Sequence, residues 1–171
     1  MAEIQLVLDA AGVHDYLNEI WPGALGAWTI DELTPSLARI RLATTEANLR
    51  PGGTVSGPTL MSLADSAAYV LVLGLLGRAA LAVTSSLHID FLRRPVPGEL
   101  IAEASLLKLG RSLITMHVLL FNALPIEPIE PIEPIESAEL AGEGTASGSA
   151  PSFDRNKPVA SVSTSYSLAL V

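Results

Sequence analysis

The longest apolar stretch of the chain runs from residue 58 to residue 76 and predicts a long helix. Pro58 suits the first turn of such a helix, and the residues after it are apolar on nearly every side, which indicates a helix that is buried all round. Four polar side chains interrupt it at i, i+3, i+4 and i+7, on a single helix face: Ser62, Asp65, Ser66 and Tyr69. A carboxylate in buried surroundings is costly unless it is paired, hydrogen-bonded or functional, so Asp65 is the first candidate for chemistry.

Segments that alternate with period two lie on both sides of this helix. Strands are expected over residues 27–33, 36–44, 82–92, 99–109, 112–121 and 158–170, and a further helix over residues 8–20. In the third of these strands, the side chains expected on the core face are Leu87, Ile89 and Phe91. The last strand alternates most regularly, with apolar residues, Thr164 and Tyr166 on one face and serines on the other. Strands before and after one long apolar helix predict an α+β fold, in which an antiparallel sheet wraps around the helix.

Residues 125–136 are four copies of Pro-Ile-Glu, followed by a run rich in Ser, Gly, Ala and Glu that ends near residue 151. A three-residue period with Pro in every unit suits polyproline II, and the run after it has the composition of disordered segments. We interpret the chain as one domain, residues 1–171, with a loop insertion at about residues 123–156. A tolerated expansion of a hairpin loop is favoured over a binding role, because long surface loops cost little stability.

Composition narrows the classes of function. The chain is 49% hydrophobic and 16% charged, which suggests additional burial at a subunit interface. Its formal net charge is −8, but six glutamates lie between residues 125 and 143, which leaves −2 for the remainder. This near-neutral body lacks the basic face of a nucleic-acid binder. The chain has no cysteine, and so neither disulfides nor a cysteine-ligated metal site.

The N-terminal residues lack the basic and apolar regions of a signal peptide, so a cytoplasmic protein is expected. The apolar run over residues 60–76 is short for a membrane span of about 20 residues and carries Asp65 near its start. A buried helix without a membrane partner is therefore favoured.

The region around the predicted helix start resembles a known family. Asn48, a glycine-rich turn, the helix start at Gly57 and an Asp eight residues later resemble the hotdog-fold thioesterases of the phenylacetate-pathway type. The resemblance extends from about residue 28 to residue 121 and resumes in the last strand. It implies the hotdog fold, hydrolysis of acyl-CoA thioesters, a homodimer or homotetramer, and no cofactor or metal. One departure is that the family usually has His-Gly-Gly at the helix start, where this chain has Ser56-Gly57-Pro58.

The resemblance also implies catalytic roles for particular residues. Asp65 corresponds to the family's general base or nucleophile, and either role suits thioester hydrolysis. Gly57 corresponds to the residue whose N–H binds the thioester oxygen, and an N–H at a helix start is suited to this. By similarity, Asn48 would orient water or the carboxylate, and Thr84 would hydrogen-bond near the attacking group. The alternative roles are structural: a turn for Gly57, and loop or strand-end positions for Asn48 and Thr84.

Six further residues complete the expected substrate site: Ser56, Met61, Ser66, Arg93, Arg94 and Arg111. Ser56 is either a helix cap or a partial substitute for the family's His. Met61 would lie beside an apolar acyl group, which is expected to be medium-chain or aromatic. The three arginines lie near predicted strand ends, where they would either contact the phosphates of coenzyme A or be solvated.

The spacing between Gly57 and Asp65 predicts an oligomer. Eight residues span about 12 Å along a helix, whereas an oxyanion donor and a base must both come within about 3 Å of one reacting centre. Two subunits with antiparallel central helices can bring Asp65 of one chain to Gly57 of the other. Two alternatives stay open: a non-catalytic acyl-CoA binding module, made plausible by Ser56, and a hotdog hydratase or dehydratase, although such enzymes usually pair the carboxylate with a histidine.

Overall fold

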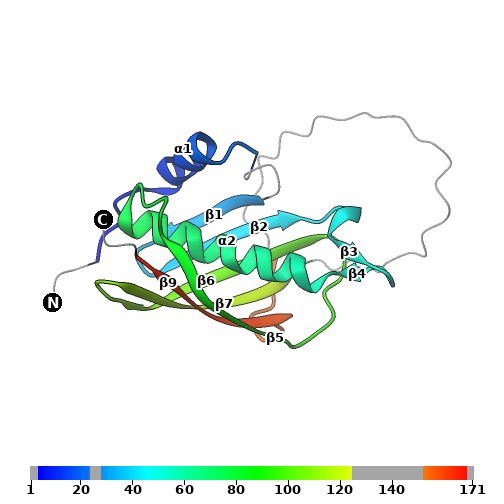
Figure 1. Cartoon of the computed structure of the whole chain (residues 1–171). Coiled ribbons are helices and arrows are strands. Elements are labelled where there is room, and N and C mark those ends of the chain that lie inside the picture. The colour runs from blue at the N-terminus through cyan, green and yellow to red at the C-terminus, as the bar shows by residue number, and fades with distance from the viewer. Residues whose placement is uncertain (1–3, 24–27, 125–151, 169–171) are drawn as a thin grey trace.

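The helix α2 (Gly57–Leu76) lies across one face of an antiparallel sheet in the computed structural model of the chain (Figure 1). The structure describes residues 4–23, 28–124 and 152–168. Before α2 come α1 (Ala10–Ile20), β1 (Trp28–Thr34), β2 (Leu37–Ala43), a 3-10 turn (Glu46–Asn48), β3 (Leu49–Arg50) and β4 (Thr54–Val55). After it come β5 (Val83–Phe91), β6 (Glu99–Leu109), β7 (Leu113–Leu124), β8 (Ser152–Phe153) and β9 (Ala160–Ser167).

The main sheet has the order β1-β2-β6-β7-β9-β5, and all of its neighbouring strands are antiparallel. The long strands β6 and β7 form its centre, and β1 and β5 are its edges. The small β3–β4 hairpin lies next to the start of α2 (Figure 1). A sheet wrapped around one central helix is the hotdog fold, so the predicted fold class is confirmed.

The core lies between α2 and the concave face of the sheet. Leu60, Leu63, Ala64 and Ala67 are buried on the helix, and the alternate residues of β6 and β7 that face them are buried as well. Burial of each such leucine stabilises the fold by roughly 1.5–3 kcal/mol. α1 covers the other side of the helix through Val13, Tyr16 and Leu17.

α2 is not buried all round, so that expectation is wrong for its first half. Residues 70–75 are all buried, but Met61 is 42% exposed, Ser62 is exposed, and Asp65 is only partly buried. The sheet covers one side of the helix, and the shorter helix α1 covers only part of the rest. α2 is long and apolar enough to cross a membrane, but 61% of that window is buried in the fold, as in the core helix of a soluble protein.

β5 differs from its expected pattern because it is an edge strand. Leu87 and Ile89 are partly buried, whereas Phe91 is 55% exposed. Phe91 still lies on the core face, as predicted, because its ring packs against the start of α2: a Cβ atom on Gly57 would be 3.3 Å from Phe91 Cζ. The predicted alternation of β9 is confirmed, with Val162, Thr164 and Tyr166 buried.

The two ends of the predicted insertion are adjacent in the structure. Leu124 at the end of β7 pairs with Ser152 of β8, and Phe153 stacks on Phe121 with ring centroids 4.7 Å apart. The Pro-Ile-Glu repeat itself lies outside the described residues.

The segment after β8 is held on the convex face of the sheet by a buried ion cluster. Glu103 is 4% exposed and accepts hydrogen bonds from Arg39 and from Arg155. Both guanidinium groups also lie over the ring of Phe153. A carboxylate at this depth is tolerated because two cations surround it.

Candidate active site

The start of α2 is set by a network of hydroxyl groups. The Ser56 hydroxyl accepts a hydrogen bond from the Thr59 N–H at 3.3 Å and lies 2.9 Å from the Thr59 hydroxyl, which donates to the Asn48 carbonyl. Ser56 is therefore the N-cap of the helix, one of the two roles considered for it. With both hydroxyls used locally, the loop and the helix start are fixed relative to each other.

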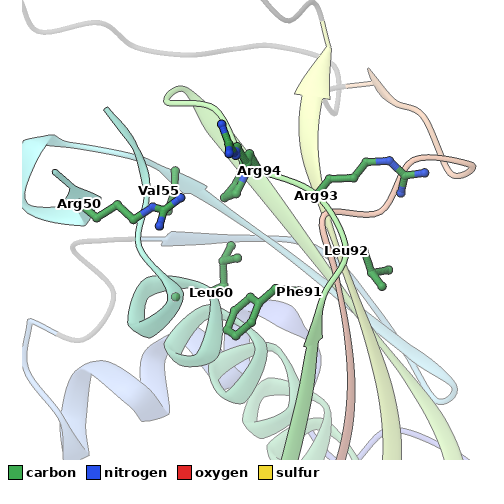
Figure 2. Close-up of a pocket in the computed structure, with 9 residues that line it drawn as sticks. Arg50, Val55, Leu60, Phe91, Leu92, Arg93 and Arg94 are labelled. Carbon is green, nitrogen blue, oxygen red and sulfur yellow. The ribbon is translucent and has the colours of Figure 1, made fainter. Parts of the chain in front are cut away.

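Gly57 is the first residue of the helix, and its N–H makes no hydrogen bond within the described part of the chain. It lines a cavity of about 470 Å³ together with Leu60, Phe91 and three arginines, two of which were predicted to bind substrate: Arg50, Arg93 and Arg94 (Figure 2). The free N–H lies at the positive end of the helix dipole. This end of α2 is therefore suited to bind an anionic group, or a group on which negative charge develops during a reaction.

The arginines of this cavity differ in what they contact. Arg93 donates to the Pro158 carbonyl at 2.8 Å, and Figure 2 shows its side chain pointing away from α2. Arg50 donates to the Thr54 hydroxyl within the β3–β4 hairpin. Arg94 is exposed and extends above the helix start in the same view. Arg50 was not predicted as a site residue, because only the fold brings the hairpin over Gly57.

Asp65 lies two helical turns further along and is held by side chains from two strands. The Thr84 hydroxyl of β5 donates to Asp65 Oδ1 at 2.6 Å, and the Tyr166 hydroxyl of β9 donates to the same oxygen at 2.7 Å. The structure thus brings Asp65 and Thr84 together, as predicted. The serines on the same helix face, Ser62 and Ser66, make no hydrogen bond to the carboxylate.

Tyr166 is the residue that sequence reasoning missed. Burial raises its pKa well above the usual value for tyrosine, and the hydrogen bond to Asp65 raises it further. The phenol therefore stays protonated and acts as a donor. Its one signal in the sequence is a hydroxyl-bearing ring on the core face of the last strand.

A cavity of about 450 Å³ opens beside Asp65. Ser66 and Thr84 line it, as do four aromatic side chains, one just after α1 and the others from β1, α2 and β9: Trp21, Trp28, Tyr69 and Tyr166. Tyr69 stacks on Tyr166 with ring centroids 6.1 Å apart, and burial raises its pKa. A carboxylate beside an apolar, aromatic cavity can act on the carbonyl group of a bound apolar acyl chain.

Asn48 is placed apart from the carboxylate. Its side-chain oxygen accepts hydrogen bonds from the Thr45 N–H at 2.8 Å and from the Thr45 hydroxyl at 3.1 Å. It lines a third cavity, next to Ser62 and Ser66, and makes no hydrogen bond to Asp65. In this chain Asn48 fixes the loop before the helix, and its water-orienting role stays a prediction.

Two predicted substrate residues lie outside the described cavities. Met61 is on the exposed side of α2 and lines none of them. Arg111 lies in the turn between β6 and β7, just before β7 begins. Strand pairing through β9 places the start of β5 level with the start of β7, and the end of β5 level with the second half of β7. Arg111 is therefore at the far end of the sheet from Arg93 and Arg94, roughly 25 Å away at about 3.3 Å per residue.

Gly57 and Asp65 line different cavities, as their separation along α2 requires. Within one chain the N–H and the carboxylate do not face a common space. Either the two cavities serve different purposes, or a second subunit completes each of them.

Comparisons with known proteins identify the family of this chain. Residues 52–127, which include both Gly57 and Asp65, match the family model "Thioesterase superfamily". A protein of Deinococcus radiodurans with a provisional esterase assignment is 37% identical over 91 residues, which are 53% of this chain and 60% of that protein. A protein of Silicibacter sp. TM1040 with a provisional thioesterase assignment has a crystal structure that is 39% identical, covers 96% of this chain and 94% of its own, and has a TM-score of 0.70.

More distant structures share the fold. Zebrafish thioesterase superfamily member 2 is 15% identical over 94% of this chain and 95% of its own, with a TM-score of 0.65. The PaaI protein of the E. coli phenylacetic acid degradation operon is 18% identical over 93% of this chain and 94% of its own, with a TM-score of 0.62. Given the near-complete overlap with the Silicibacter protein and the motif at the start of α2, the chain belongs to the thioesterase superfamily.

Proposed function

We propose that this protein hydrolyses acyl-CoA thioesters in the manner of the phenylacetate-pathway type, with a medium-chain or aromatic acyl group. The observation that carries the proposal is the Asp65 carboxylate beside an aromatic-lined cavity, with two donors on one of its oxygens. Because both hydrogen bonds go to Oδ1, Oδ2 is left to accept a proton from water or to attack the thioester carbonyl carbon. The cavity volume of about 450 Å³ falls in the usual range for small-molecule sites.

The reaction needs an oxyanion donor that a second subunit would supply. Gly57 of the same chain is about 12 Å from Asp65 along the helix. Among the described strands, β5 is an unpaired edge. It has apolar side chains that are exposed, among them Val83 at 59% and Phe91, and such edges are normally covered. Pairing of two β5 edges about a two-fold axis would place two α2 helices antiparallel on one face of a continuous sheet, with each Asp65 near the partner subunit's Gly57.

The chemistry then requires only these groups. Asp65 Oδ2 takes a proton from water while the water oxygen bonds to the thioester carbonyl carbon, and the partner's Gly57 N–H stabilises the oxyanion that forms. Collapse of the tetrahedral intermediate breaks the carbon–sulfur bond, and the thiolate takes the proton from Asp65. The products are the free acid and coenzyme A. Direct attack by Oδ2, followed by hydrolysis of the anhydride, gives the same products.

Recognition of coenzyme A would fall to the arginines at the start of α2. Arg50 and Arg94 line the Gly57 cavity, and phosphate groups bind well to arginine and to free N–H groups at helix starts. This basic end stands out in a chain with a formal net charge of −8.

The alternatives have less support. A hydratase would need a histidine near the carboxylate, but none of the three histidines lines the cavity of Asp65 or that of Gly57. A binding module would use the same cavities without turnover, so activity separates it from the enzyme.

Thiol release from phenylacetyl-, benzoyl-, hexanoyl- and octanoyl-CoA tests the proposal, with Asp65→Asn as the matched variant. The parent is expected to turn over at least one substrate, and Asp65→Asn to lose at least about 10²-fold in kcat while it keeps its fold by circular dichroism. Asp65→Asn activity within a factor of two of the parent would contradict the role of Asp65. Binding of all four compounds without hydrolysis would indicate the binding module.

A further inference from the structure

We propose that Tyr166 is a positioning residue that fixes the Asp65 carboxylate so that Oδ2, and not Oδ1, faces the substrate. The proposal rests on the function proposed for Asp65 above. It concerns a strand residue outside the helix-start motif, and its basis is the set of hydrogen bonds around this one carboxylate.

The two donors on Asp65 converge on the same atom. Thr84 Oγ1 lies 2.6 Å and Tyr166 Oη 2.7 Å from Oδ1, whereas Oδ2 receives no hydrogen bond from the described residues. A carboxylate torsion is broad and roughly two-fold, so the two oxygens would otherwise exchange places readily. Two donors on one side remove that freedom.

The single hydroxyl proton of Tyr166 has two acceptors within reach, and the carboxylate is favoured. The Asp65 backbone carbonyl is 3.0 Å from Oη, against 2.7 Å for Oδ1. That carbonyl also accepts the helical bond from the residue four positions later, whereas a bond to an ionised oxygen is shorter and stronger. The proton therefore points to the carboxylate, and the carbonyl contact fixes the ring relative to the helix backbone.

Tyr166 is itself held rigidly. It is 2% exposed, lies on β9 between β7 and β5, and stacks on Tyr69 of the helix. The ionisable groups that line this cavity are Asp65, Tyr69 and Tyr166, so no cation competes for the carboxylate there. The Tyr166 hydroxyl therefore donates from a fixed position and in a fixed direction, whereas a water molecule at the same place could move and rotate.

Loss of this donor should change the reaction more than it changes binding. In Tyr166→Phe, Thr84 alone would hold Oδ1, and the carboxylate would spend part of its time turned away from the substrate. Since hydrogen bonds to charged groups are among the stronger ones, kcat should fall by about tenfold or more, with KM within about a factor of two.

Thr164→Val is the matched control. Thr164 lies on the same face of the same strand, is buried, and donates to the Ser86 carbonyl at 2.9 Å without contacting Asp65. Loss of its hydroxyl should lower the melting temperature in the way that any lost buried hydrogen bond does, but it should leave kcat and KM unchanged. A purely structural role for Tyr166 would make its Phe variant behave like this control.

The experiment compares the parent, Tyr166→Phe, Thr164→Val and Asp65→Asn by thiol release and by proton NMR. A hydroxyl proton bonded to a carboxylate should appear far downfield in the parent, vanish in Tyr166→Phe and shift upfield in Asp65→Asn. If Tyr166→Phe matches Thr164→Val in kcat and KM, the inference is overturned while the proposed function stands. If the parent hydrolyses none of the substrates, the proposed function fails. The hydroxyl resonance then tests the hydrogen bond between Tyr166 and Asp65 by itself, and a resonance that Asp65→Asn leaves unchanged would overturn that bond.

Discussion

Tyr166 in the last strand and Asp65 in the central helix are 101 residues apart in the chain, yet the Tyr166 hydroxyl is 2.7 Å from Asp65 Oδ1. Thr84, in the strand that pairs with β9, bonds to the same oxygen. The carboxylate is thus held by β5, an edge strand of the described sheet, and by its neighbour β9. In the proposed dimer, β5 would form part of both the site and the interface.

The raised pKa of Tyr166 predicts a loss of stability at alkaline pH. An unfolded tyrosine releases its proton near pH 10, whereas the folded protein holds the Tyr166 proton because the ring is buried and bonded to Asp65. Stability is therefore complete below about pH 10 and falls as pH rises from there toward the folded pKa. Urea unfolding across this range should show a shallower fall in the free energy of unfolding for Tyr166→Phe. Equal slopes for parent and variant would contradict the burial of an un-ionised phenol.

The arginine cavity predicts that coenzyme A and a shorter thiol carrier will be distinguished. Arg94→Gln should raise KM for acyl-CoA by about tenfold, since it removes one charge-assisted contact to phosphate. Its KM for the corresponding acyl-pantetheine, which has no phosphate, should not change. Arg78→Gln is the control, because Arg78 pairs with Glu19 beyond the opposite end of α2. An equal effect of Arg94→Gln on both substrates would show that the arginine does not contact the phosphates.

The buried ion cluster around Glu103 predicts a large stability effect away from the site. Glu103→Gln leaves Arg39 and Arg155 facing each other without their carboxylate, which should cost about 3 kcal/mol. The matched change Glu99→Gln breaks the pair with Arg41 at a more exposed position and should cost less than about 1 kcal/mol. Urea denaturation measures both. Similar costs for the two variants would mean that the cluster is solvated.

The pairing of β7 with β8 predicts that the insertion can be removed. Leu124 and Ser152 are partners, so a short Gly-Ser turn in place of residues 125–150 should join the strands without strain. The melting temperature and the rate of thiol release should stay close to those of the parent. A large fall in melting temperature, or a changed oligomer in sedimentation, would show that the repeat packs against the rest of the protein.

Regular hydrophobic patterns made most of the fold predictable. The 20-residue helix and the long strands were predicted to within a few residues, because an apolar run bounded by Gly and Pro and a strict alternation each fit one kind of element. The partial exposure of α2 and of Phe91 was not predictable, since periodicity shows which residues share a face but not whether another layer covers it.

The candidate site was predictable only where it follows the helix. Gly57 and Asp65 share one continuous segment, and their spacing alone indicates that one chain cannot join them. Tyr166 and Arg50 reach the site through strand pairing and a hairpin, contacts that no local pattern encodes. Arg111 lies at the other end of the sheet from Arg93 and Arg94 of the same chain, which a strand end alone does not reveal, and its role in substrate binding stays a prediction.

The shared site is the central claim, and mixing two inactive variants tests it most directly. Asp65→Ala removes the carboxylate, and Gly57→Pro removes the N–H, provided that circular dichroism shows an intact fold. In a mixed dimer one site carries both lesions and the other carries neither, so refolding equal amounts together should restore about a quarter of the parent activity. A mixture of Asp65→Ala with Asp65→Asn should restore no activity, because both variants lack the carboxylate and every site of their mixed dimer lacks it too. Purified mixed dimers of Asp65→Ala and Gly57→Pro that stay as inactive as their parents would contradict a site shared between two chains.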